Sequence, residues 1–301
     1  DNIHMVREHN RIILCVFLLL TLFSASCSNT PQSSLKNSAH QYKRILPVST
    51  SVEEIVLALA DPEEIAAVTA YARASSNPLI LEKTKRIKNT ISPNPSTEEI
   101  LSYKPDCILM PIVFNKAQAD TLSEMGFYVV RLELPEGYEA IKERILLIAK
   151  SIDKEERGSN LIQKMDERMK TVRSHLKDIP RKKIVVGYSP FGAFGRKGGA
   201  FDHICEKAGV INAGSVVNLK RGEHITKEQI IEINPDVILY SASSVNSANV
   251  DDVKHDPAFA NVRAVKENRV LVIEDRYMSS VTQCFIDSVE VIAKAVYPEE
   301  F

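Results

Sequence analysis

The chain has 301 residues, which is long enough for about two domains that each bury a core. Its formal net charge is −1 and it contains no tryptophan, so neither nucleic acid nor an acidic membrane surface is an expected partner.

The N-terminal residues 1–27 predict an exported protein. Arg7 and Arg11 precede an apolar run at 12–23, and small residues follow it before Cys27. A basic segment, a short apolar segment and a small-residue cleavage site are typical of a signal peptide, and the run is shorter than a membrane-spanning helix of about 20 residues. Cys27 resembles the lipidated cysteine of a bacterial lipobox, although Ser24 stands where leucine is usual, so plain secretion stays open.

The segment after Cys27 is rich in Ser, Asn, Thr and Gln and has no apolar period, which indicates a flexible tether. Beyond it, strand and helix patterns alternate until the helical stretch from Tyr138 to Leu176. The predicted organisation is a signal peptide at 1–27, a tether at 28–42, an N-terminal α/β lobe at 43–152, a spine helix at 153–180 and a C-terminal α/β lobe at 181–301.

The first lobe begins with a predicted strand at 44–48 and a helix at 52–59 that a capping box at Ser51 opens. A strand at 65–68 and the segment 96–109 follow. Then come a loop at 111–115, a helix that Gly126 ends, and a strand at 127–132.

A degenerate repeat relates the two lobes. Ser96-Thr-Glu-Glu-Ile-Leu-Ser-Tyr-Lys-Pro-Asp-Cys-Ile-Leu109 returns as Thr226-Lys-Glu-Gln-Ile-Ile-Glu-Ile-Asn-Pro-Asp-Val-Ile-Leu239. Each copy predicts a hydroxyl N-cap, a two-turn helix that stops before proline, and a short buried strand. Two such units predict an α/β fold of two Rossmann-like lobes with mostly parallel sheets, joined by one long spine helix, with ligands bound at the carboxyl ends of the strands.

The second lobe begins with a predicted strand at 183–188, followed by a glycine-rich loop at 189–200 and a helix at 201–208. After the second repeated unit come a Ser/Asn-rich loop, a last strand at 269–273 and a closing helix at 282–296. Cys107 and Cys205 lie within apolar patterns and are predicted to be core residues.

Enzyme motifs are missing from the sequence. The glycine-rich loop lacks the Gly-x-Gly start of a dinucleotide fingerprint and the Gly-Lys-Ser/Thr of a P-loop, and no Gly-x-Ser-x-Gly elbow occurs. The histidines are scattered singly, and the strand-end loops of the first lobe offer no set of His or carboxylate ligands for zinc or manganese. We therefore expect no catalytic residue, no resident metal and no cofactor, and we keep a Zn/Mn-binding protein as an alternative.

The repeat, the spine helix and the ending from Asp256-Pro-Ala-Phe259 to Tyr297-Pro298 together resemble the helical-backbone family of ABC-importer substrate-binding proteins. Members of that family carry ferric siderophores, haem or vitamin B12. The resemblance implies a monomer that is lipid-anchored outside the cytoplasmic membrane, binds a small-molecule metal chelate and performs no chemistry. It also implies that Glu98 and Glu228, the matching first-turn carboxylates, dock onto arginines of a permease dimer. From the residues alone, such carboxylates are also favoured simply because they oppose the helix dipole.

Loop residues at strand ends are the candidates for contacting the ligand, in a cleft expected to be apolar and edged by Tyr and Arg. The main candidates are Tyr71, Phe114, Tyr188, Phe194, Arg196, Tyr240, Arg276 and Tyr277, with Ser49, Thr50, Asn115, Phe191 and Lys197 as further candidates. A ferric siderophore is the expected cargo. Cobalamin is disfavoured by the absence of tryptophan, and haem by the absence of a Gly-Tyr-x-Arg pattern, although Tyr71 could serve as an axial ligand.

Overall fold

A computed structural model describes residues 42–75, 77–242 and 250–301, which belong to the compact unit Gln41–Phe301. The predicted signal peptide, Cys27 and the tether up to residue 41 lie outside the described residues. No helix in the part of the chain that the structure describes is long and apolar enough to cross a membrane.

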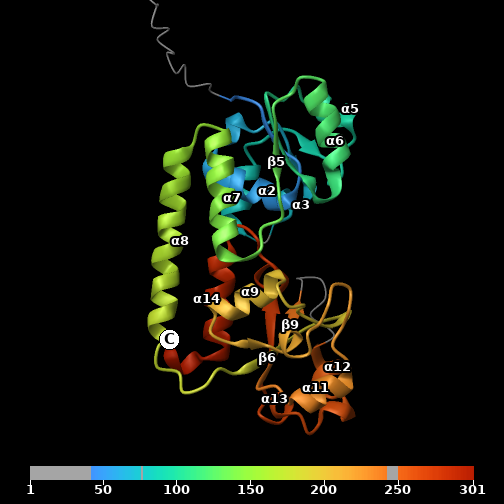
Figure 1. The fold of residues 1–301 in the computed structure, drawn as a ribbon, viewed down its shortest axis with the longest axis vertical. Coiled ribbons are helices and arrows are strands. Elements are labelled where there is room, and N and C mark those ends of the chain that lie inside the picture. Colours follow the sequence, from blue (N-terminus) through green and yellow to red (C-terminus); the bar gives the residue numbers. More distant parts are fainter. Residues whose placement is uncertain (1–41, 76, 243–249) are drawn as a thin grey trace, which may run out of the picture. The chain divides into compact units, whose positions relative to one another are not determined.

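The first lobe contains the elements from β1 to α7 (Figure 1). In chain order they are β1 (Ile45–Pro47), α2 (Thr50–Leu59), η1 (Pro62–Glu64), β2 (Val68–Thr69), α3 (Ala70–Arg73), α4 (Pro78–Thr84), β3 (Thr90–Ile91), α5 (Thr97–Ser102), β4 (Cys107–Pro111), α6 (Ile112–Glu124), β5 (Val129–Leu132) and α7 (Gly137–Ser151). Strands β1, β4 and β5 form a parallel sheet in the order β1-β4-β5, and β2 pairs with β3 in a second, two-stranded parallel sheet.

The second lobe contains the elements from β6 to η5 and follows the spine helix α8 (Glu155–His175). Its elements are β6 (Ile184–Ser189), β7 (Gly192–Phe194), α9 (Ala200–Lys207), β8 (Ile211–Asn212), α10 (Ala213–Val216), α11 (Lys227–Ile233), β9 (Val237–Ala242), α12 (Val250–Lys254), η3 (Pro257–Phe259), α13 (Arg263–Lys266), β10 (Val270–Glu274), η4 (Asp275–Tyr277), α14 (Phe285–Val296) and η5 (Pro298–Glu300). The sheet runs β10-β9-β6-β7 with β8 also paired to β6, and β7 is its antiparallel strand. The predicted fold class, two α/β lobes with mostly parallel sheets, is confirmed.

Both repeated units fold as the sequence predicts. The Ser96 hydroxyl accepts the Glu99 N–H at 3.1 Å, and Thr226 makes the full reciprocal capping box with Gln229. The helices end at equivalent places, because Lys104 and Asn234, each directly before a proline, have φ of 48° and 50°. A residue before proline is disfavoured in the right-handed helical region, so the proline of each unit stops its helix.

The strands of the two units are buried on both faces. In β4, Cys107 and Leu109 face a core that extends through both lobes and the spine, whereas Ile108 and Met110 face a core of the first lobe alone. Strand β9 repeats this alternation, with Val237 and Leu239 in the shared core and Ile238 and Tyr240 in a core of the second lobe. The alternation follows from the two-residue period of a strand and places helices on both faces of each sheet.

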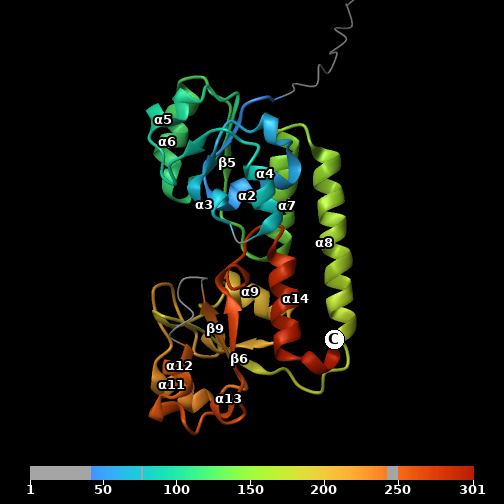
Figure 2. The same ribbon diagram turned by 180° about the vertical axis from the view of Figure 1, so that it is seen from behind.

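The spine helix packs against α7 and α14, as Figure 2 shows from behind. Asp153, with φ of 56°, turns the chain between α7 and α8. Gly158 allows the two helices to approach closely, because a Cβ there would lie 2.6 Å from the Ala149 Cβ. At the other end, the Arg168 guanidinium pairs with Asp287 and Glu290 of α14. The spine is therefore fixed to both lobes.

Three local predictions were wrong. Residues 112–115 begin helix α6 rather than a loop, and the glycine-rich loop contains strand β7, which forms an antiparallel hairpin with β6. The N-cap of α2 is Ser49, not Ser51, and the Glu54 carboxylate expected to complete the capping box bonds elsewhere. Glu53 accepts from the Thr69 N–H and hydroxyl, and Glu54 accepts from Thr282.

Candidate functional site

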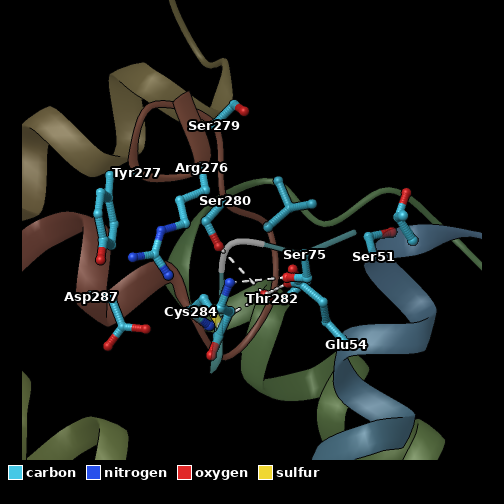
Figure 3. A pocket seen from close by; sticks show the side chains of 13 residues that line it. Ser51, Glu54, Ser75, Arg276, Tyr277, Ser279, Ser280, Thr282, Cys284 and Asp287 are labelled. Carbon is cyan, nitrogen blue, oxygen red and sulfur yellow. Dashed lines mark hydrogen bonds between the residues drawn. The ribbon is translucent and has the colours of Figure 1, made fainter. Parts of the chain in front are cut away.

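A cavity of about 260 Å³ lies where the first turn of α2 faces the segment that follows β10 (Figure 3). We call it the hydroxyl pocket, because six of its lining side chains carry a hydroxyl group on an aliphatic carbon. They are Thr50, Ser51, Ser75, Ser279, Ser280 and Thr282. Arg276, Tyr277 and Glu54 also line it, so both lobes contribute to one site at the carboxyl ends of their strands.

The two lobes are hydrogen-bonded to each other along the wall of this pocket. The Thr282 hydroxyl donates to Glu54 Oε2 at 2.7 Å (Figure 3). Gln283 Nε2 donates to the Glu54 backbone carbonyl at 2.9 Å. Burial raises the pKa of Glu54, and the charge of Asp287 raises it further, against the opposing effects of the Thr282 hydrogen bond and the Arg276 charge. Two contacts at a single turn of α2 therefore tie the lobes together beside the cavity.

Arg276 and Tyr277 form a stacked pair at the pocket. The Arg276 guanidinium carbon lies 4.4 Å from the centre of the Tyr277 ring, and its Nε donates to Glu274 Oε2 at 2.9 Å. Burial raises the pKa of Tyr277, so its phenol stays protonated at neutral pH. The pair therefore offers a guanidinium and a neutral hydroxyl, which suit oxygen-rich groups of a ligand.

A second cavity, of about 340 Å³, shares Ser279 with the hydroxyl pocket. We call it the cationic pocket, because Arg196, Lys220 and His224 line it with Glu223 as the one acidic residue among its lining side chains. Phe194, Phe201 and Met278 form its apolar wall, and the rings of Phe194 and Phe201 meet edge to face with centroids 5.3 Å apart. It lies at the same carboxyl edge of the second-lobe sheet.

The backbone below the cationic pocket is tightly packed. Gly195 has φ of 118°, and Asn212 Nδ2 donates to its carbonyl at 2.7 Å. A Cβ at Gly214 would lie 1.9 Å from the Gly195 carbonyl oxygen, so only glycine allows this approach. Asp202 holds the same region by accepting from Gly198 N–H, Asn212 and Ser215. The glycine-rich sequence thus allows backbone segments to pack closely beneath the cationic pocket.

The structure brings together four of the predicted ligand residues. Phe194 and Arg196 line the cationic pocket, and Arg276 and Tyr277 line the hydroxyl pocket. Tyr71 is 64% exposed on α3 and is not among the residues that line either cavity. The side chain of Phe114 lies outside the described part of the structure.

Two predicted tyrosines pack within the second lobe. Tyr240 is 1% exposed in its core, because it occupies an inward position of the β9 alternation, so the ligand-binding hypothesis does not extend to it. Tyr188 stacks on Tyr240, with ring centroids 6.2 Å apart, and packs against the same core. Thr50, one of the further candidates, lines the hydroxyl pocket, but sequence reasoning missed its other serines and threonines, because isolated hydroxyl residues in loops carry no distinctive spacing. The expected apolar cleft is instead lined mainly by polar side chains there.

Glu98 and Glu228 are exposed at equivalent positions in the first turns of α5 and α11. Hydrogen bonds from its own backbone N–H and from the Ser96 hydroxyl lower the pKa of Glu98, and the matching groups, with Thr226, lower that of Glu228. Both carboxylates therefore carry a full charge at neutral pH. Figure 1 shows their helices on different lobes and away from α8.

The described residues contain no group of three His, Cys, Asp or Glu side chains arranged to hold a metal ion. Cys107 and Cys205 are buried and Cys284 is half-buried, and burial raises the pKa of each thiol. The prediction that Cys107 and Cys205 are core residues is confirmed.

Comparison with known proteins gives a consistent result. Residues 45–277 match a family described as periplasmic binding protein. The Bacillus subtilis protein named uncharacterized ABC transporter substrate-binding lipoprotein YvrC is 23% identical over 266 residues, which cover 86% of this chain and 81% of that protein. The Fe(3+)-citrate-binding protein YfmC of B. subtilis is 24% identical over 281 residues, covering 86% of this chain and 87% of the relative.

Solved structures show the same fold. The periplasmic haem-binding protein RhuT from Roseiflexus sp. RS-1, in its apo form, superposes with a TM-score of 0.73 over 86% of this chain and 99% of that chain. The two sequences are 20% identical, so this likeness speaks for the fold and not for the ligand.

Proposed function

We propose that this chain, which belongs to the periplasmic binding protein family, captures a chelated metal complex outside the cytoplasmic membrane and delivers it to the permease of an ABC importer. The observation that carries the proposal is the pair of adjoining cavities at the carboxyl edge of the second lobe, one of which the first lobe completes. A ligand held there contacts both lobes. A permease that also contacts both lobes can then distinguish the loaded protein from the empty one.

The cargo that we propose is a ferric siderophore. A bare ion finds no ligand set among the described residues, whereas an iron already surrounded by a chelator needs only contacts to the outside of the chelator. The hydroxyl groups and the Arg276 guanidinium of the hydroxyl pocket suit the oxygen atoms of such a chelator. The relative YfmC, named as a ferric citrate binder, carries an iron complex of this general kind.

Haem and cobalamin are the alternative cargoes. Haem requires an axial ligand, and Tyr71, the candidate from the sequence, does not line either cavity. Tyr277 lines the hydroxyl pocket, but its ring is covered on one face by Arg276. These features favour a polar chelate over a flat apolar macrocycle.

Binding of coloured ligands tests the cargo directly. A soluble form that begins at Ser28 would be titrated with ferric siderophores, haem and cobalamin, while visible absorbance and the melting temperature are followed. We expect saturable binding of a ferric siderophore and a rise in melting temperature by mass action. Stabilisation by zinc, manganese or a nucleotide alone, with no response to any chelate, would contradict the proposal.

Glu98 and Glu228 are proposed to dock this protein onto cationic residues of the permease, one carboxylate for each lobe. Their support is their matching position, full exposure and charge. The double variant Glu98→Ala/Glu228→Ala should bind ligand normally and lose uptake in cells. The control is Glu124→Ala/Glu232→Ala, which removes two other exposed carboxylates. Full uptake with the docking variant would refute the docking role.

Lipid anchoring through Cys27 completes the proposal and is suggested by the lipoprotein names of relatives such as YvrC. The change Cys27→Ala should move the protein from the membrane fraction to the soluble extracytoplasmic fraction. Unchanged membrane association after this substitution would rule out the anchor.

A further inference from the structure

We propose that the cargo is a polyanionic chelate whose negative charge is bound in the cationic pocket by Arg196 and Lys220. This inference rests on the proposed function, because it specifies the chemical class of the complex that the same site receives. The charges around the cationic pocket and the positions of the segments that hold them support it.

Arg196 and Lys220 are not neutralised by ion pairs among the described residues. None of the ion pairs among the described residues includes Arg196 or Lys220, and the Arg196 side chain donates only to the Lys197 carbonyl, at 3.2 Å. Lys197 and Arg221, the sequence neighbours of these two residues, are exposed and add positive charge.

The single acidic residue that lines the pocket is engaged by its own turn. Glu223 Oε2 accepts the backbone N–H of Lys220 at 2.8 Å, so this carboxylate turns toward the backbone. The lining therefore presents an excess of positive charge over negative charge. Such an imbalance beside an apolar wall attracts an anion more strongly than it would in open solvent.

The two cations are held on segments that are tied to one another. The Lys197 N–H donates to the Leu219 carbonyl at 3.3 Å, which joins the residue after Arg196 to the residue before Lys220. The Arg196 side chain lies along the glycines before α9, since a Cβ at Gly199 would lie 3.0 Å from its Cγ. This arrangement leaves the guanidinium partly exposed at the pocket and reduces the ordering that ligand binding would require.

The adjoining hydroxyl pocket does not carry the same excess of charge. Arg276 is paired with Glu274, and Asp287 is paired with Arg168. The Glu54 carboxylate accepts a hydrogen bond from the Thr282 hydroxyl. A complex that spans both cavities therefore meets neutral hydroxyl groups on one side and unpaired cations on the other. This pattern matches a ferric complex of carboxylate or catecholate groups, and it disfavours neutral or cationic hydroxamate complexes.

Calorimetric titration of the mature chain with ferric complexes of different charge tests the inference. We would compare ferric citrate and a ferric tris-catecholate with the neutral complex ferrichrome and the cationic complex ferrioxamine B. At least one anionic complex should bind about 100-fold more tightly than either hydroxamate. The affinity of that complex should fall when sodium chloride is raised, because partly exposed charges are screened.

Two variants locate the effect. Arg196→Gln and Lys220→Gln should each weaken binding of the anionic complex about tenfold or more, which is the usual consequence of losing a charge-assisted hydrogen bond. Lys266→Gln is the matched control, because it removes an exposed second-lobe cation outside both cavities and should leave affinity unchanged. Equal melting temperatures of the variants and the parent protein would show that folding is unaffected.

The outcomes separate this inference from the proposed function. If ferrichrome binds as tightly as the anionic complexes, or if both variants bind like the parent, the anionic class is wrong while the carrier function stands. If no ferric complex of any charge binds, the proposed siderophore cargo is wrong, and iron-free citrate then tests the cationic pocket alone. Citrate binding that is lost in Arg196→Gln and Lys220→Gln would support an anion-binding site in the cationic pocket. Absence of citrate binding would refute that site.

Discussion

Replacing Arg144 with methionine should stabilise this protein. Arg144 lies on the buried face of α7 between Ile141 and Ile148 and is 5% exposed. Its Nε and Nη1 atoms have no hydrogen-bond partner among the described residues. Burying these two guanidinium nitrogens without partners is destabilising, because they have lost water and gained no hydrogen bond in exchange.

The expected gain in stability follows from the pKa of the Arg144 guanidinium. Burial lowers the pKa of Arg144 from 12.5 to about 10. At about 1.4 kcal/mol for each pKa unit, holding the charged form inside costs about 3 kcal/mol. Methionine keeps much of the aliphatic volume, so Arg144→Met should raise the free energy of unfolding by about 2 kcal/mol and Tm by roughly 4–8 °C.

Urea denaturation of the mature chain, followed by circular dichroism, measures this change. The gain should be the same at pH 6 and pH 8, since the folded-state pKa lies well above both and the guanidinium is charged throughout. Lys150→Met is the control, because it removes an exposed cation from the same helix and should change stability by no more than about 0.5 kcal/mol. A loss of more than about 1 kcal/mol in Arg144→Met would refute the reasoning, since it would mean that the guanidinium is paired in the folded protein.

Three further predictions follow from single residues. Burial alone would raise the pKa of Asp236, but hydrogen bonds from two arginines and one backbone N–H outweigh it and lower the pKa to about 2. A carboxyl whose pKa is lower in the folded protein than in the unfolded chain stabilises the fold at pH values above the unfolded pKa. The free energy of unfolding should therefore fall by about 2 kcal/mol as pH falls from about 4 to 2, and Asp236→Asn should not show this loss in an acid titration. Gly214→Ala should lower the free energy of unfolding, measured by urea denaturation, by more than about 2 kcal/mol, because the new Cβ would lie 1.9 Å from the Gly195 carbonyl oxygen. An unchanged free energy of unfolding would contradict the close packing. Burial, with two nearby carboxylates, raises the pKa of Cys284 to about 12. Its thiol in the folded protein should therefore react with a disulfide reagent at pH 8 over 100-fold more slowly than in 6 M guanidinium. Rapid labelling of the folded protein would contradict this, because it would show that the thiolate is accessible.

Much of the fold could be predicted from the sequence because its signals are local. The hydroxyl caps Ser96 and Thr226, the prolines that end the two helices and the apolar strands after them all act within about ten residues of one another. Their recurrence at two places in the chain was enough to predict two similar lobes, and the helical spacing of apolar residues between Tyr138 and Leu176 predicted the helix that joins them. The N-cap of α2 was misplaced, because Glu53 and Glu54 bond to groups that are distant in sequence.

The site was decided by tertiary structure. Tyr240 looked like a strand-end ligand residue, yet the sheet turns it into the core. The hydroxyl pocket joins residues of α2 to residues more than two hundred positions later, as the bond from Thr282 to Glu54 shows. Sequence by itself therefore determined the elements and the family resemblance, because capping, periodicity and chain breaks are short-range effects. Only the packed structure decided which hydroxyls and cations share a cavity, because that depends on contacts between segments that no local pattern relates.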